Sequence, residues 1–468
     1  MTHETPPNGF RTFVILWASQ SVSMIGTALT FFAVNIWLAQ SLYPRPEQKM
    51  PLAHALSAVG LVWGLPLVVG APIAGAWADR HDRRRTMIAM NLLSAAIGGA
   101  IIALMLANAL TLPLLLALLL VYFLAGAFHA ASFDTSYAML VTQDQLPRAN
   151  GMMQSIWALS GLVSPGLAAG LIALPALARA GHVPGPAGVT LARLQQGVPL
   201  ALGLDAVSFL VAAVVMVALV IPSPKRTDLG ADGRPSVSLL ADVRRGWLYI
   251  WHRRPMLWLL GTFAVVNLFG APSAVLQPML VKFNLAPDWK ARGFEFASAL
   301  ALLATAQGLG GLVGGIAISA WGGLKTKRVL GVLVPLAFAG IFEAIYGLSP
   351  WIWLSAAMVF VMGAFLPAIN AHSQSIWQAQ VPRELQGRVF SVRRLIAQCT
   401  FPIGTVIGGW LGGAMNPGTA IAILGAVLIL FGVAQLMNPI LLRVEDKAYL
   451  DALAAPHEGM PQAAAAGE

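Results

Sequence analysis

The sequence predicts an all-α polytopic membrane protein whose twelve transmembrane helices form two pseudo-symmetric six-helix bundles. Three observations support this fold class: the composition is apolar, twelve segments are long enough to cross a bilayer, and the two halves of the chain repeat. Only 10% of the 468 residues are charged, 57% are hydrophobic and the mean hydropathy is +0.74. Soluble domains carry about 25% charged residues. Most of this surface must therefore face hydrocarbon.

The twelve segments each hold roughly the 20 apolar residues that a helix needs to cross the hydrocarbon core with its backbone polar groups satisfied internally. In the first half they are Thr12–Ala39, Leu56–Trp77, Met87–Asn108, Leu112–Phe133, Ala149–Leu174 and Leu200–Ile221. In the second half they are Leu257–Val281, Phe296–Trp321, Val329–Leu348, Trp351–Ile376, Val389–Met415 and Thr419–Leu442.

The longest polar connection divides the chain near its middle. It runs from Pro222 to Pro255, is basic, and carries a helix-like stretch near Ser238–His252. We therefore expect an N-terminal bundle over 1–222, a basic cytoplasmic linker over 223–255, a C-terminal bundle over 256–442 and a flexible cytoplasmic tail over 443–468. The first apolar segment is too long for a signal peptide, so we expect it to be retained as a helix.

The basic residues segregate strongly when the connections are placed on alternate sides of the membrane. With the N-terminus in the cytoplasm, 22 of the 29 Lys and Arg fall on that side. The opposite side receives only Arg45, Lys49, Arg179, Arg193, Lys282, Lys290 and Arg292. The positive-inside rule then predicts a multi-pass protein of a bacterial-type inner membrane with both termini cytoplasmic. The net charge of +10 is thereby explained without a nucleic-acid partner.

The single cysteine, Cys399, excludes an internal disulfide framework and argues against a structural zinc site. It lies in an apolar run, and we expect a small buried side chain rather than a reactive thiol.

Three short patterns recur at equivalent places in the two halves. Gly70–Asp79 matches Gly310–Ser319, and each is followed by a basic loop. Gly126-Ala127-Phe128 recurs as Gly363-Ala364-Phe365. Leu146-Pro147-Arg148 with Gly151 recurs as Val381-Pro382-Arg383 with Gly387. Three matches in register indicate an internal repeat.

The loop between the second and third segments carries the most specific motif. The run GAWADRHDRRR, from Gly75 to Arg85, resembles the cytoplasmic signature G-x-x-x-D-R-x-G-R-(R/K) of the major facilitator superfamily. Physically, Gly75 would let two helices approach closely, and Asp79 would suit the positive N-terminus of another helix. The resemblance implies a latch between the cytoplasmic ends of the two halves, made by Gly75, Asp79, Arg80, Arg83, Arg84 and Asp134. Asp82 replaces the usual glycine, and Ser319 replaces the acid in the second copy.

The fifth segment resembles a second family signature. Gly151, Ser160, Ser164-Pro165 and Ala168-Ala169 follow the spacing G-x8-G-x3-G-P-x2-G-G, with small residues in place of most glycines. In the superfamily this signature marks exporters that exchange substrate for protons. The run LDAVSFL at 204–210 is also similar to the macrolide and siderophore exporter branch.

Ionisable groups in hydrocarbon are costly, so each is a functional candidate. Asp134 lies at the inner end of the fourth segment, where it could carry a proton or pair with Arg83. Glu343, in the ninth segment, is a second candidate, while Asp205 is expected at headgroup level or as a cap. The proton-coupling candidates are Asp134, Glu343, His129 and His372. The acid that the family resemblance implies early in the first segment is absent, and Thr27 follows Gly26 there.

By resemblance to the superfamily, segments 1, 4, 7 and 10 line a substrate cavity between the halves. Sparse polar groups among apolar and aromatic walls suit an amphipathic ligand. The substrate-cavity candidates are Gln20, Phe31, Phe32, Asn35, Asn267, Gln277, Asn370, Gln374 and Trp377.

These patterns predict a secondary transporter, proton-coupled and exporting amphipathic small molecules by alternating access. The alternative is an importer or facilitator of a metabolite or lipid with the same fold. A non-transporting receptor or scaffold is disfavoured because a static scaffold needs no gate. We expect no enzyme activity, no metal and no cofactor beyond the proton gradient; the expected partners are the substrate and the lipid bilayer, and the chain is expected to be a monomer.

Overall fold

The computed structural model describes residues 8–142, 144–221 and 239–458. Every regular element in these residues is a helix, and twelve helical stretches are long and apolar enough to span a membrane. The predicted fold class is confirmed.

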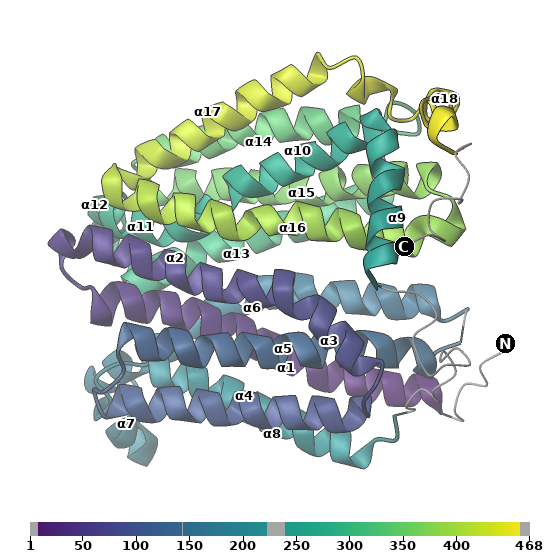
Figure 1. The fold of residues 1–468 in the computed structure, drawn as a ribbon. Helices are drawn as coiled ribbons and strands as arrows, with labels where there is room; N and C mark the ends of the chain where they lie inside the picture. Colours follow the sequence, from purple (N-terminus) through teal and green to yellow (C-terminus); the bar gives the residue numbers. More distant parts are fainter. Residues whose placement is uncertain (1–7, 143, 222–238, 459–468) are drawn as a thin grey trace.

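The first bundle contains six spans (Figure 1). Its helices are α1 (Gly9–Trp37), α2 (Lys49–Leu65), α3 (Ala71–Ala78), α4 (Arg83–Leu106), α5 (Leu112–Leu140), α6 (Leu146–Arg179), α7 (Gly185–Ala192) and α8 (Val198–Ala218). The second span is bent: Pro66 cannot donate a backbone hydrogen bond, and a π-helical turn over Pro66–Gly70 separates α2 from α3.

The second bundle repeats this plan. After α9 (Leu239–His252) its helices are α10 (Arg254–Gly270), α11 (Pro272–Phe283), α12 (Ala286–Ala291), α13 (Phe296–Trp321), α14 (Leu330–Leu348), α15 (Ile352–Gln380), α16 (Arg383–Ala414), α17 (Pro417–Leu436) and α18 (Lys447–Glu458). The seventh span is split into α10 and α11 at Pro272. The matching patterns Gly126–Phe128 and Gly363–Phe365 both lie in the fourth span of their bundle, in α5 and α15, as the repeat predicts.

Two regions differ from their sequence expectations. The stretch left between the predicted segments Ala149–Leu174 and Leu200–Ile221 contains the last turn of α6 and the whole of α7. The tail, expected to be flexible from 443, forms α18, where Leu450 and Ala454 are buried and Arg253 lies 3.9 Å from Asp451. An amphipathic helix gains stability by burying its apolar face, which composition alone did not reveal. Residues 459–468 and most of the linker lie outside the described residues.

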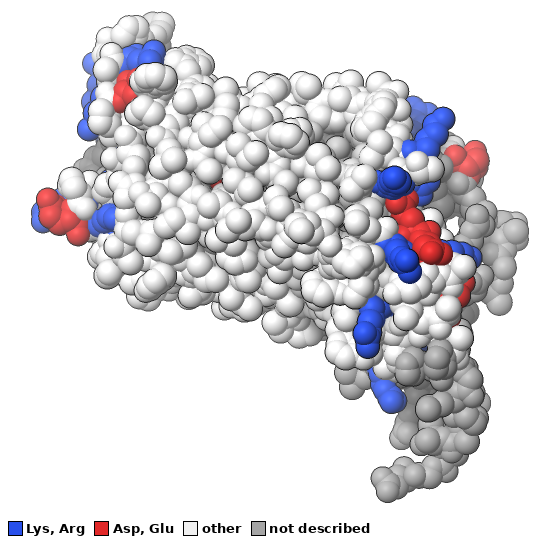
Figure 2. Space-filling view, turned by 90° about the horizontal axis from the view of Figure 1, so that it is seen from above, with Lys and Arg blue, Asp and Glu red and all other residues white. Residues whose placement is uncertain are grey.

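Both ends of the described chain lie at one end of the bundle (Figure 1), and we call it the terminal end and its opposite the far end. Figure 2 shows Lys, Arg, Asp and Glu gathered at these two ends, and the face between them is almost free of charged side chains. That face is expected to contact lipid.

Candidate functional site

The surface between the two bundles is packed closely from the far end to the middle of the molecule. α2 lies against α16: a Cβ on Gly60 would be 3.1 Å from a Thr405 methyl, and one on Gly64 would be 3.2 Å from Pro402. The Ser57 hydroxyl donates to the Thr405 carbonyl at 2.8 Å. These small residues let the backbones approach, as is usual for helix packing in membranes.

Aromatic rings join the same surface near mid-depth. The Trp63 ring lies 6.2 Å from Phe31 of its own bundle and 5.1 Å from Phe401 of the other. α6 meets α13 at a similar depth, where a Cβ on Gly308 would be 3.1 Å from the Gly161 carbonyl.

Two lysines close the far end reciprocally. Lys282, from the second bundle, donates to the carbonyls of Ala39 and Tyr43 where the first span ends. Lys49, from the first bundle, donates at 2.6 Å to the Met415 carbonyl where α16 ends. A cation at a helix C-terminus satisfies unpaired carbonyls and interacts favourably with the helix dipole. Each bundle therefore caps a helix of the other.

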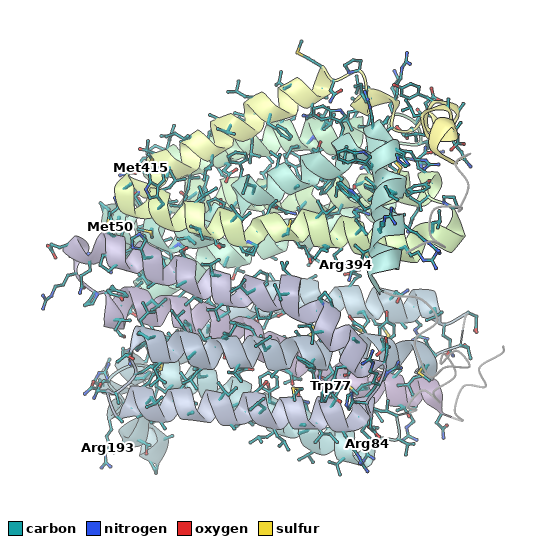
Figure 3. The ribbon with its side chains drawn as sticks, in the orientation of Figure 1. Met50, Trp77, Arg84, Arg193, Arg394 and Met415 are labelled. Atoms are coloured by element: carbon teal, nitrogen blue, oxygen red, sulfur yellow. The ribbon has the colours of Figure 1, made fainter. Side chains whose placement is uncertain are left out.

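Toward the terminal end each bundle has a core of its own. Phe13, Leu16, Met87 and Leu140 are buried together in the first bundle. A separate buried cluster around Trp377 and Ile250 belongs to the second bundle and its linker helix. Figure 3 shows Met50 and Met415 side by side at the far end, with Arg394 toward the terminal end.

The Asp79 loop makes its contacts within the first bundle. Arg83 lies 3.8 Å from Asp79 and donates to the carbonyls of Ala78 and Thr135. Arg84 donates to the carbonyls of Met216 and Val217 at the end of α8. The predicted pairing of Arg83 with Asp134 is not formed in this conformation; Asp134 is exposed.

Two other features of the loop differ from expectation. A Cβ on Gly75 would have no neighbour within 4 Å, so the close helix approach predicted there is absent in this conformation. Asp82, which replaces the signature glycine, caps α4 by accepting from the Arg85 backbone N–H at 2.8 Å. Aspartate is a favoured N-cap, which explains how the loop tolerates it. Arg80 is exposed.

The fifth span is tied to the first by its small polar residues. The Ser160 and Ser164 hydroxyls donate to the Met24 and Ile25 carbonyls of α1, at 3.0 and 2.8 Å. Serines at signature glycine positions therefore replace close packing by hydrogen bonding.

The candidate proton-coupling residues lie in different surroundings. Glu343 is buried, and its Oε1 accepts from the Ser273 hydroxyl of α11 at 2.8 Å. His372 accepts from the Leu324 N–H at 2.9 Å through Nε2, and its Nδ1 lies 2.7 Å from the Ala368 carbonyl. These contacts hold the α13–α14 connection, which gives His372 a structural role here. The His129 Nε2 is buried without a hydrogen-bond partner.

The cavity candidates also separate into groups. Trp377 is fully buried and Gln20 is 2% exposed, so both lie within their bundles in this conformation. Phe31 and Phe32 pack against the far-end core. Asn370 is exposed, and the Gln374 carbonyl oxygen accepts from Arg393 at 2.7 Å.

The remaining amides mostly bond backbone or stay unpaired. The Asn35 amide donates within α1 to the Phe31 carbonyl, and the Asn267 amide donates to Ala397 of α16. The Gln277 Nε2 is buried without a partner.

Sequence reasoning missed the lysine caps and the true position of Asp205. Asp205 is 2% exposed and receives hydroxyl hydrogen bonds from Thr30 and Tyr122. Cys399, expected to be buried, is exposed. Hydropathy identifies a span but not the direction in which each residue faces.

The family model described as Major Facilitator Superfamily matches residues 16–398. The chain belongs to this superfamily. The description fits the two repeated six-helix bundles and the Asp79 loop, and it identifies the chain as a membrane transporter rather than an enzyme.

Curated relatives within the superfamily cover most of the chain. Macrolide efflux protein A of Streptococcus pyogenes is 24% identical over 397 residues, covering 84% of this chain and 88% of the relative. Multidrug efflux pump Tap of Mycolicibacterium fortuitum is 26% identical over 390 residues, covering 82% and 87%.

Solved structures of superfamily transporters share the fold. A bacterial homologue of the human lysosomal transporter Spinster, inward-facing and unoccupied, has a TM-score of 0.61 at 15% identity and covers 96% of this chain and 97% of its own. A bacterial homologue of the iron transporter ferroportin has a TM-score of 0.58 at 16% identity, covering 93% and 99%.

Proposed function

We propose that this superfamily member exports amphipathic small molecules from the cytoplasm by proton antiport. The observation that carries the proposal is the similarity, over more than four fifths of the chain, to proteins named for macrolide and multidrug efflux. The antiporter-like fifth span supports export as the direction of transport. The small number of polar groups between the bundles supports an amphipathic ligand.

The proposed orientation follows the charge asymmetry: the terminal end faces the cytoplasm. The structure then corresponds to an inward-facing state, closed at the far end by Lys49, Lys282 and the rings around Trp63. Export requires these contacts to open while the terminal ends come together. The Asp79 loop is placed to join the bundles in that second state, where an ionised Asp79 would meet the positive N-terminus of a helix.

Ligand recognition is assigned to the surface between the bundles on the terminal side of the Trp63 rings, where each bundle has a core of its own. Asn370 and Gln374 supply polar groups from α15, and Phe31 supplies an aromatic wall from α1. Few hydrogen bonds and much apolar contact would allow one site to accept ligands of different shape.

Proton coupling is assigned first to Glu343. It is buried between α14 and α11, and its hydrogen bond to Ser273 links it to the seventh span, which lines the proposed cavity. A carboxyl buried in hydrocarbon is stable only when paired or protonated. Asp134 and His129 remain further candidates.

The test is expression in a bacterium that lacks its own efflux pumps, scored by tolerance to erythromycin and ethidium. We expect tolerance to at least one compound to rise at least fourfold over an empty vector, and Glu343→Gln to remove the gain while leaving membrane protein levels unchanged. Unchanged tolerance across both compounds and a broader panel of lipophilic drugs, with normal protein levels, would argue against export.

The second candidate function is a facilitator or importer. It is favoured by one observation: Thr27 stands in the first span where the resemblance implies an acid. Reconstituted protein would then move ligand equally with and without a proton gradient.

A further inference from the structure

Asp205 occupies a point where three spans of the first bundle meet. It lies on α8, 2% exposed, against Gly26 and Thr30 of α1 and Tyr122 of α5. A Cβ on Gly26 would be only 2.4 Å from the Asp205 Oδ1, so a side chain at that position would displace the carboxyl.

The two carboxyl oxygens are unequally satisfied. Oδ2 accepts from the Thr30 hydroxyl and the Tyr122 hydroxyl, each at 2.6 Å. Oδ1 is buried and has no hydrogen-bond partner in the described part of the chain; the neighbouring Ser208 hydroxyl donates instead to the backbone carbonyl of Asp205 at 2.7 Å. An ionised carboxylate has about four positions that can accept a hydrogen bond, and the two hydroxyls fill about half of them.

No described cation compensates a charge at this point. α8 packs against α1, α4 and α6. Tyr122 is the titratable group that faces the carboxyl. The side of α4 that contacts α8 next to Asp205 carries Gly98, which lies against Ala206. The polar side chains of α6, Ser160 and Ser164, bond to α1 instead. Arg84 of α4 contacts α8 at Met216 and Val217, at least eleven residues and about 16 Å along the helix from Asp205. An unpaired buried charge is costly, and a neutral acid removes that cost.

A line of hydroxyls leads from this carboxyl to the surface between the bundles. The Tyr122 hydroxyl lies 3.2 Å from the Thr27 hydroxyl on α1. Thr27 is four residues before Phe31 and shares its helix face. Phe31 packs on Trp63, which contacts Phe401 of the other bundle, so that face is directed to the second bundle. Thr27 is half-buried, one turn below these rings.

We propose that Asp205 is a proton-binding site of the first bundle, reached from the surface between the bundles through the hydroxyls of Thr27 and Tyr122. The inference rests on the proposed proton-coupled transport and adds a site to it. Only O–H bonds form and break: a proton from water at Thr27 is relayed to the carboxylate, and the reverse path releases it. The ionised form needs both Thr30 and Tyr122 as donors, so its charge state is linked to the packing of α1 and α5 on α8.

Difference infrared spectroscopy on the purified full-length protein between acid and alkaline pH tests the site without any substrate. We expect a titrating carbonyl band of a protonated carboxyl that disappears in Asp205→Asn and persists in the matched control Glu343→Gln. Tyr122→Phe should move the band to higher wavenumber because the carboxyl loses a hydrogen bond. Identical titrating bands in wild type and Asp205→Asn would overturn the proposal.

If Asp205→Asn does not fold, Tyr122→Phe decides alone. A band with unchanged position in that variant overturns the site.

Flux in liposomes, with ethidium as the probe, separates this site from the proposed function. We expect Asp205→Asn to lose ethidium accumulation driven by a pH gradient by at least tenfold while retaining exchange of ethidium down its own gradient. Accumulation at the wild-type level overturns the site. Absence of gradient-driven flux in the wild type counts against the proposed function instead, and leaves the infrared test of Asp205 intact.

Discussion

The far and terminal ends of the surface between the bundles are built differently. At the far end, glycines, serines and two lysines bring α2 against α16 and the end of the first span against α11, and the two lysines bond backbone carbonyls rather than carboxylates. At the terminal end, each bundle has its own core, and the arginines of the Asp79 loop bond within the first bundle. The contrast teaches that many weak contacts close the far end, and we propose that closure of the terminal end depends instead on the charged Asp79 loop. Weak contacts can be exchanged without a large barrier, as an alternating transporter requires.

The largest effect is expected from locking the far end. A Cβ on Gly413 would lie 3.6 Å from the Met50 Cβ, a separation that suits a disulfide. Met50→Cys with Gly413→Cys, in a Cys399→Ser background, should crosslink on oxidation and reduce transport to background. Reductant should restore it, and the single variant Met50→Cys should be insensitive. Normal transport by the crosslinked protein would show that the far end does not open.

A smaller effect is expected from removing one lysine cap. Cys399 is exposed on α16, three residues before Pro402, which contacts Gly64. Lys282→Met should weaken the contacts at the far end by about 1–2 kcal/mol and so shift the equilibrium fivefold to thirtyfold toward the state that is open at the far end. The terminal side closes in that state, so thiol labelling of Cys399 should slow. Lys290→Met is the matched control, since Lys290 is exposed and lies over Trp289. Faster labelling in Lys282→Met would contradict the assignment. Lys49→Met should act in the same direction but less, because Lys49 bonds one carbonyl rather than two.

At the terminal end, the two copies of the repeat should respond unequally. Asp79→Asn should reduce the transport rate severalfold, whereas Ser319→Ala should change it less than twofold, because Ser319 only bonds its own helix at Gly315. Asp79 is exposed and lies 3.8 Å from the buried Arg83 guanidinium, which keeps its hydrogen bonds to the Ala78 and Thr135 carbonyls. The pair is therefore worth about 1 kcal/mol or less, and thermal stability should hardly change in either variant. Equal transport rates in the two variants would remove the functional asymmetry between the copies.

The smallest effect is expected in the far-end connection between α11 and α13. The Arg292 hydrogen bond, together with the Ile352 N–H, lowers the pKa of Asp288 below its usual value. The ionised Asp288 carboxylate therefore stabilises the folded protein at pH values above the pKa of Asp288 in the unfolded chain. This stabilisation is lost as pH falls through the lowered pKa of the folded protein. Asp288→Asn should lower the melting temperature slightly near neutral pH and match the wild type in acid. Glu47→Gln, at the same end, serves as control; a difference that grows in acid would contradict this account.

The sequence was sufficient to predict the membrane spans and the repeat of the two halves. Hydrocarbon demands long apolar helices, so hydropathy located all twelve spans, and the repeated fragments such as Gly126–Phe128 placed the halves in register. The linker helix near 238–252 was also predicted and is α9. The tail helix α18 was missed because its stability comes from docking beside Arg253.

The contacts of the candidate site were harder to predict from the sequence. Lys49 and Lys282 looked like ordinary residues of outer loops, because their targets are backbone carbonyls that carry no sequence signal. Trp377 and Asn370 are seven residues apart on one helix, yet the first is fully buried and the second is exposed.

The sequence by itself determined the membrane class, the number of spans, the two-bundle repeat and the family-specific Asp79 loop. These features follow from local composition and spacing, which bilayer thickness and helix geometry convert directly into structure. Only the tertiary structure decided which end of the two-bundle surface is closed and which carboxyls are buried. Thr30, Tyr122 and Asp205 lie far apart in the chain, and only the packing of α1, α5 and α8 makes them one site.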